Sequence, residues 1–121
     1  MFEEEIKKLK PFERYIISYS SLQDTYSFAS NSYKESYLKI KFENTKYTKY
    51  YLDNITIYTS RLESRLHVVK ICKEDIDAST LTESQKQQLK SGEDLLNKVE
   101  TLLNDMKNFL SKHNIELSTS L

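Results

Sequence analysis

Few side chains in this sequence have the chemistry of a catalytic or metal site, and their spacing does not assemble one. His67, His113 and Cys72 are too few for a zinc site made of protein ligands alone, and His113 is far from the other two in sequence. A nucleophilic Cys72 would need an organised base, and His67, five residues away, is a poor helical neighbour. A single glycine, Gly92, excludes a glycine-rich phosphate loop. We therefore expect no catalytic residue, no metal, no cofactor and no enzyme activity.

His67 is the residue best placed for chemistry of its own. Lys70 follows it by three residues and Glu63 precedes it by four, so the three share one face of a helix. A histidine on a helical bundle beside a lysine resembles a histidine phosphotransfer domain, and the resemblance implies that His67 would accept the phosphoryl group. In that family a glycine typically follows the lysine, whereas Ile71 stands there in this sequence. We expect an ordinary surface histidine.

A second candidate site combines lysines with aromatic rings. Lysines can neutralise phosphates, and aromatic rings can stack on unpaired bases. Both types alternate through residues 39–51, which makes nucleic-acid binding an alternative function, although we expect these tyrosines to lie in the core and these lysines in solvent. The residues are Lys39, Lys41, Lys46, Lys49, Phe42, Tyr47, Tyr50 and Tyr51.

The most regular pattern predicts a helix over residues 82–113, followed by a polar tail over 114–121. Thr82 and Gln85 can form a capping box at its start. His113 suits the negative end of the helix dipole, and Asn114 can adopt the conformation that ends a helix. Apolar positions recur in steps of three and four, which makes a broad stripe on one face. They are Leu89, Gly92, Leu96, Val99, Leu103, Met106 and Leu110.

Two more helices are predicted upstream, over 12–42 and 46–77. Pro11 suits the first turn of the first of them. The stripe is weakest at 43–45, so an all-α, antiparallel bundle of three helices of about 30 residues in one domain, 1–121, is favoured. A break at 30–32 is an alternative, and no break at all would leave one long helical hairpin. Apolar residues recur at seven-residue intervals along the first helix and into the second: Phe12, Tyr19, Tyr26, Tyr33, Ile40 and Tyr47.

A β-hairpin over residues 37–59 is the minority alternative. This segment is rich in Tyr, Thr, Ile and Phe, and Leu38, Ile40 and Phe42 alternate as they would in a strand. The turn would fall at 44–46, but it lacks a glycine for the positive φ angles that tight hairpins prefer.

Charge is balanced overall and unevenly distributed. Residues 34–73 carry nine basic and four acidic side chains, and residues 74–121 carry five basic and nine acidic ones. The simplest interpretation is a basic helix packed on an acidic one, and the alternative is a basic patch for an anionic partner. One cysteine, no apolar run long enough to span a bilayer, and the acidic start at Glu3–Glu5 predict an intracellular protein, cytoplasmic or nuclear.

Tyrosine usage provides the main functional hypothesis. All nine tyrosines precede residue 59, where a self-sufficient bundle would carry leucine. Tyrosine joins a large apolar body to a polar tip and is enriched at protein interfaces. We expect a non-enzymatic helical interaction module, a small subunit of a larger hetero- or homo-oligomeric assembly, with a stand-alone adaptor or chaperone for one client as the alternative. The residues expected to bind the partner are Tyr15, Tyr19, Tyr26, Tyr33 and Tyr37.

Overall fold

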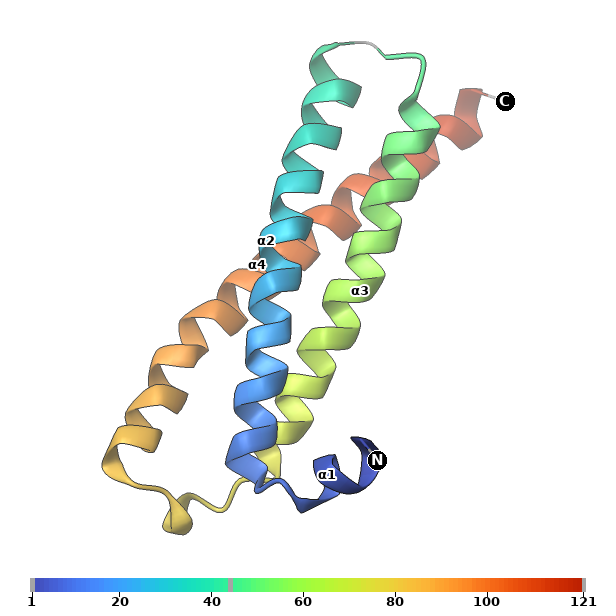
Figure 1. Ribbon diagram of the computed structural model, residues 1–121. Helices are drawn as coiled ribbons and strands as arrows, with labels where there is room; N and C mark the ends of the chain where they lie inside the picture. Colours follow the sequence, from blue (N-terminus) through green and yellow to red (C-terminus); the bar gives the residue numbers. More distant parts are fainter. Residues whose placement is uncertain (1, 44, 121) are drawn as a thin grey trace.

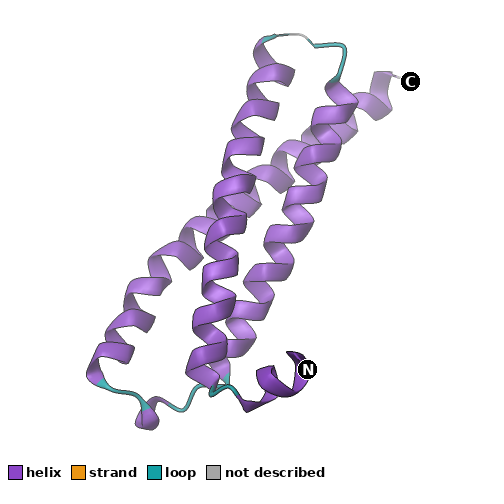
Figure 2. Ribbon diagram, viewed as in Figure 1, coloured by secondary structure: helices purple, strands orange, loops and turns teal. Residues whose placement is uncertain are grey.

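A computed structural model describes the backbone of residues 2–43 and 45–120 and the side chains of residues 3–5, 7–43 and 45–113. Within these ranges the chain is helical and contains no strand (Figure 2), so the predicted all-α class is confirmed. The elements in chain order are α1 (Phe2–Lys8), α2 (Pro11–Phe42), α3 (Thr48–Glu74), the short 3₁₀ helix η1 (Ala78–Thr80) and α4 (Glu83–Ser120).

The helices α2 and α3 form a long antiparallel hairpin, and α4 packs obliquely across one side of it (Figure 1). The contact between α2 and α3 is the most extensive in the structure. Small residues on α2 allow this close approach, because Ala29 and Ser36 are both buried on the side that meets the rest of the bundle. The predicted helical bundle is therefore present, built as a hairpin with a third long helix laid over it.

The break between α2 and α3 falls where the apolar stripe is weakest. Helix α2 ends at Phe42 and α3 begins at Thr48, so the alternative of one continuous helix without a break is wrong. The alternative break at 30–32 is also wrong, because α2 continues through these residues. The predicted β-hairpin over 37–59 is not borne out either. The three- and four-residue spacing of Leu52, Ile55 and Thr59 lets this segment bury one helical face, and that burial outweighs its strand-like composition.

Pro11 begins α2, as predicted, and it also separates α2 from α1, a helix that the sequence pattern did not indicate. Lys10 has extended backbone angles because a residue before proline is driven out of the helical region. The guanidinium of Arg14 donates to the Leu9 carbonyl oxygen from Nε (3.2 Å) and Nη2 (3.0 Å), which ties the junction to α2.

The capping box at the start of α4 is confirmed. The Gln85 amide donates to Thr82 Oγ1 (3.1 Å), and the Thr82 amide donates to Gln85 Oε1 (3.0 Å). The predicted end at residue 113 is wrong, because α4 continues to Ser120. Residues 114–120 contain neither glycine nor proline, so nothing in the backbone forces the helix to stop at Asn114. The side chains from Asn114 onward lie outside the described residues.

The core is a single cluster to which the three long helices each contribute one row. The rows follow three- and four-residue steps on α3 and α4. On α2 the buried row has a seven-residue step and lies beside the predicted series from Phe12 to Ile40, whose members are only partly buried. Deep burial of these residues supplies the main stabilisation of the bundle. The buried apolar residues are Tyr15, Leu22, Ala29, Leu52, Ile55, Leu62, Leu66, Val69, Leu96, Val99, Leu103, Met106 and Phe109.

Candidate functional site

The tyrosines predicted to bind a partner lie on the side of α2 that faces α4. Tyr15 is only 1% exposed, and Tyr19, Tyr26 and Tyr33 are half-buried against the core. Tyr37 is the most exposed of the five, at 37%. Direct contact between Tyr15 and a partner would require α4 to leave the hairpin. The partner-binding role of these tyrosines therefore stays a prediction, and its most accessible member is Tyr37.

Tyr15 fits closely against α4 at the one glycine of the chain. A Cβ atom added to Gly92 would lie 2.4 Å from the Tyr15 hydroxyl oxygen and 3.1 Å from Cε2 of Tyr19. The Tyr15 hydroxyl has no hydrogen-bond partner among the described residues. Burial raises the pKa of this phenol, with smaller contributions from Tyr19 and Glu93. These observations make Tyr15 a packing residue of the α2–α4 contact.

Tyr33 and Tyr37 pack against Phe109 of α4 farther along the same side. Their ring centroids lie 5.8 Å and 5.4 Å from that of Phe109. The Tyr33 hydroxyl reaches the Asp105 carbonyl oxygen at 3.5 Å, and burial raises the pKa of Tyr33, with further contributions from Asp105 and Tyr37. The tyrosines on this side of α2, Tyr15, Tyr19, Tyr26, Tyr33 and Tyr37, thus form the surface on which α4 packs. We call them the tyrosine row.

Large apolar side chains are exposed along the opposite side of the hairpin. On α2 they belong to the series 17, 21, 24, 28, 31, 35, 38 and 42, and on α3 to the series 47, 50, 54, 57, 61, 64, 68 and 71. Steps of three and four place each series on one helical stripe, with polar residues at the other positions. We call the two stripes together the outer face. Its apolar members, each 44% to 73% exposed, are Ile17, Phe28, Leu38, Phe42, Tyr47, Tyr50, Ile57, Val68 and Ile71.

Helical geometry turns the outer face away from α4. Glu63 and Lys70 of α3 form ion pairs with α4, and at about 100° per residue the α3 stripe lies about 120° around the helix from them. Tyr33 and Tyr37 of α2 contact Phe109, and the α2 stripe lies about 150° from them. Figure 1 views the hairpin from its outer side, with α4 crossing behind.

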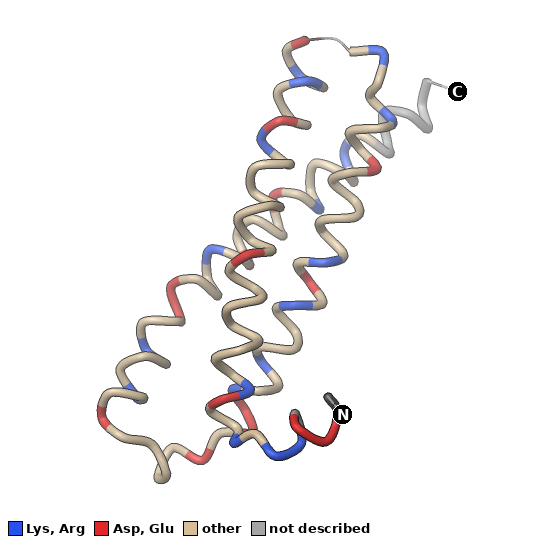
Figure 3. Tube along the Cα trace, in the orientation of Figure 1, with Lys and Arg blue, Asp and Glu red and all other residues tan. Residues whose placement is uncertain are grey.

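The outer surface of α2 carries very little charge. Asp24 is the only charged residue between positions 15 and 33, a stretch that contains six serines. In Figure 3 the middle of α2 is accordingly almost free of coloured charge. Uncharged surface loses less hydration energy than charged surface when a partner covers it, and charged residues are depleted in the centres of protein interfaces.

Helix α4 presents a different surface. Between residues 83 and 113 it exposes no large apolar side chain, and its stripe is used entirely against the hairpin. Its charges pair with α3, at 2.6 Å for Lys70–Glu100, 3.6 Å for Lys73–Glu93 and 3.1 Å for Lys107–Glu63, between side-chain nitrogen and oxygen atoms. The first two pairs join a basic residue of α3 to an acidic residue of α4, as expected for a basic helix packed on an acidic one. The unused apolar surface of the described chain therefore belongs to the hairpin alone.

The three residues of the phosphotransfer resemblance lie together in the structure, but two of them form ion pairs with residues of α4. His67 is exposed beside a surface pocket that Glu63 and Lys70 also line. Lys70 pairs with Glu100 and Glu63 pairs with Lys107, so both point toward α4. Ile71 is also exposed and lies on the outer face. Phosphotransfer through His67 stays a hypothesis that no contact in the structure favours.

The lysine and aromatic segment 39–51 forms the loop end of the hairpin. Phe42, Tyr47 and Tyr50 are each more than half exposed, which differs from the core position expected for Tyr47. They are exposed because they lie on the outer face, which is turned away from α4. The Lys46 ammonium lies 5.3 Å from the centroid of the Tyr47 ring, and Lys39 pairs with Glu43 at 2.6 Å.

Sequence reasoning missed most of the outer face because polar residues interrupt both of its stripes. Phe28 and Ile57, for example, have only polar or charged neighbours one turn away on their stripe. The available signal was a second series with the same three- and four-residue steps, offset from the core series on both helices.

No helix within the described residues is long and apolar enough to cross a membrane. The described side chains also contain no group of three His, Cys, Asp or Glu residues arranged to hold a metal ion. Comparisons of this chain with protein-family models, with curated proteins and with solved structures found no match.

Proposed function

We propose that this chain is a helical protein–protein interaction module, without catalysis of its own, that works as a subunit of a larger assembly. The observation that supports this most is the outer face, where large apolar groups are exposed on two adjacent helices while α4 exposes none between residues 83 and 113. Exposed apolar surface that spans neighbouring elements is typical of interaction sites on soluble domains. An intracellular location and the absence of enzyme activity remain predictions that accompany this proposal.

In this proposal the two sides of the α2–α3 hairpin have different roles. The side of the α2–α3 hairpin that carries the tyrosine row is covered by α4, which leaves the outer face for the partner. Phe28 is the natural centre of such an interface, since it is 67% exposed in the least charged part of α2. Large aromatic residues near the middle of an interface commonly carry much of the binding energy.

Site-specific photo-crosslinking in the native cells tests this proposal. A photoreactive residue replaces Phe28 in one variant and Asn108, an exposed residue on the side of α4 away from the core, in the matched control. We expect protein adducts from position 28 and few from position 108. Equal adduct formation at both positions, or none at position 28, would contradict an interface on the outer face.

A stand-alone adaptor or chaperone for one client is the alternative within the same class. Such a protein would be a stable monomer that meets its client only transiently, whereas a subunit would co-purify with its partner as a defined complex. The mass of the complex purified from native cells separates the two.

Nucleic-acid binding at the loop end of the hairpin is the second candidate, and the exposure of Phe42, Tyr47 and Tyr50 beside lysines favours it. Binding of this kind weakens steeply as salt rises, because phosphate contacts release counterions. Retention on single-stranded DNA at low salt that is lost in the Tyr50→Ala variant would support it. No retention of the wild-type chain at low salt would remove it.

A further inference from the structure

We propose that the partner of the outer face is a second copy of this chain, in a two-fold dimer whose axis runs parallel to the α2–α3 hairpin. The inference rests on the proposed function, because it names the partner of the same surface. In this arrangement α2 of one copy lies over α3 of the other, and both α4 helices remain on the outside. Three observations support it: the size of the face, its charges and the distribution of its apolar groups.

The outer face has the area that a stable dimer needs. Helix α3 has 27 residues, which at 1.5 Å per residue makes it about 40 Å long. Two adjacent helices, each about 10 Å wide, give a face about 20 Å across. The product is about 800 Å² per copy, or about 1,600 Å² for two copies, which is the standard size of a specific protein interface.

The outer face carries two acidic groups, Asp24 and Glu35, and one basic group, Arg61, and of these Asp24 and Arg61 match each other across such a dimer. Asp24 on the α2 stripe forms no ion pair among the described residues, and Arg61 on the α3 stripe only stacks on Tyr58, with its guanidinium carbon 5.6 Å from the ring centroid. The hydrogen bond from Arg65 to Ser21 shows which residues of α2 and α3 lie at the same level along the hairpin, that is, the register of the two helices.

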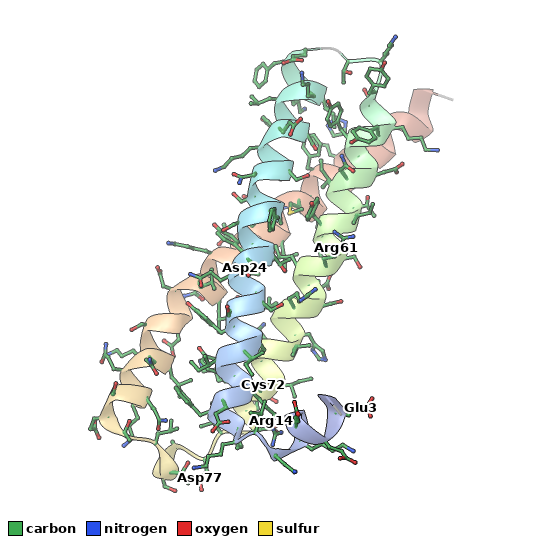
Figure 4. The ribbon with its side chains drawn as sticks, in the orientation of Figure 1. Glu3, Arg14, Asp24, Arg61, Cys72 and Asp77 are labelled. Atoms are coloured by element: carbon green, nitrogen blue, oxygen red, sulfur yellow. The ribbon has the colours of Figure 1, made fainter. Side chains whose placement is uncertain are left out.

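This register places the two charges level with each other. Three residues onward from Ser21 on α2 is Asp24, and four residues back from Arg65 on the antiparallel α3 is Arg61. Figure 4 labels Asp24 and Arg61 at similar heights along the hairpin. When α2 of one copy lies over α3 of the other at the same level, Asp24 of each copy faces Arg61 of its partner, and symmetry forms this pair twice.

The same charges disfavour the other face-to-face dimer. A two-fold axis across the hairpin would lay α2 over α2 and α3 over α3, each antiparallel. Asp24 and Glu35 stand about equally far from the middle of the α2 stripe, so they would face each other between copies. With the axis instead level with Arg61, Arg61 and Asp24 would each face their own copy, because the register places these two residues at the same level. Like charges brought together in an interface oppose association, so the axis parallel to the hairpin is the favoured one.

Seven of the nine apolar groups lie toward the two ends of the outer face, where a parallel dimer brings like ends together, and the other two, Phe28 and Ile57, lie near its middle beside the charged pair. The loop end carries aromatic groups, and the other end carries aliphatic ones. In the dimer each end meets its own copy, so that aromatic packs on aromatic and aliphatic on aliphatic, with the charge pairs between them. The loop end holds Leu38, Phe42, Tyr47 and Tyr50, and the opposite end holds Ile17, Val68 and Ile71.

Sedimentation velocity of the purified full chain with a charge swap tests the dimer. The wild type should sediment with a mass of about 28.6 kDa, twice the 14.3 kDa of one chain. Asp24→Arg and Arg61→Asp should each weaken the dimer by about 10- to 100-fold in Kd, and the double variant should restore most of the loss. Asn108→Arg, on the outer side of α4, is the matched control and should leave the Kd unchanged. Circular dichroism checks that each variant remains helical.

Two results would overturn the inference. One is a wild-type mass of 14.3 kDa at about 100 μM, a concentration at which any specific interface of standard size associates. The other is a double swap that associates no better than the single variants. Crosslinks from position 28 in native cells distinguish a failure of the proposed dimer from a failure of the proposed interaction module. Adducts only to a different protein would remove the second copy as partner and leave the interaction module, whereas no adduct at all would remove both.

Discussion

The contact between Tyr15 and Gly92 predicts an unusual response to a substitution that normally stabilises helices. Gly92 lies inside α4, where replacing glycine by alanine ordinarily gains about 1 kcal/mol. Here the new Cβ atom would lie 2.4 Å from the Tyr15 hydroxyl oxygen, well inside contact distance. Tyr15 is 1% exposed, so its ring has little room to withdraw. Overpacking of this kind costs about 1–3 kcal/mol, and Gly92→Ala should therefore lower the free energy of unfolding by up to about 2 kcal/mol.

Tyr15→Phe should reverse the sign of this effect. The variant removes a buried hydroxyl that has no hydrogen-bond partner among the described residues, which should raise the free energy of unfolding by about 1 kcal/mol. With the oxygen gone, the nearest remaining obstacle to a methyl group at position 92 is Cε2 of Tyr19 at 3.1 Å, and Tyr19 is half-buried and able to give slightly. Gly92→Ala in the Tyr15→Phe background should then be neutral or stabilising.

Urea denaturation followed by circular dichroism at 222 nm measures all four proteins of this cycle. The reasoning predicts a coupling energy of about 1–3 kcal/mol between the two positions. If Gly92→Ala stabilises the wild-type background by about 1 kcal/mol and the two substitutions are additive, the close approach of α4 to Tyr15 would be refuted.

Other properties of the bundle follow from single contacts. Thr82→Ala should lower the free energy of unfolding by about 1 kcal/mol because the capping box loses its hydroxyl acceptor; an unchanged urea midpoint would contradict this. Burial raises the pKa of Tyr15 and Tyr33 above 10.0, so their contribution to stability is complete below pH 10 and is lost as pH rises through the folded values. Absorbance at 295 nm should accordingly show two of the tyrosines ionising late and with unfolding. Lys70→Ala should cost less than about 1 kcal/mol, because its 2.6 Å pair with Glu100 is exposed; a larger loss in urea denaturation would show a deeper role.

The sequence predicted those parts of the fold that depend on local chemistry. The capping box of Thr82 and Gln85 and the position of Pro11 at the start of α2 both hold, because each depends only on residues within one turn. The break after Phe42 also follows from the interrupted stripe. The end of α4 was wrong because Asn114 permits a helix to end and does not force it.

The candidate site was harder to predict because α2 carries two apolar stripes. The tyrosine row and the series of Ile17, Phe28, Leu38 and Phe42 both have helical spacing, so periodicity alone does not say which of them a third helix will cover. The structure shows α4 on the tyrosine row, where Gly92 makes room for Tyr15. That choice depends on the fit between two helices distant in sequence, and no local pattern contains it.

The central claim is that the outer face of the α2–α3 hairpin is the surface through which this chain joins an assembly. The most direct test is the intact mass of the complex purified from native cells for Phe28→Asp, compared with wild type and with the control Asn108→Asp. We expect wild type and the control to share one mass above 14.3 kDa, and Phe28→Asp to return to 14.3 kDa while it remains helical. A Phe28→Asp variant that keeps the wild-type mass, or a wild-type mass of 14.3 kDa, would contradict it.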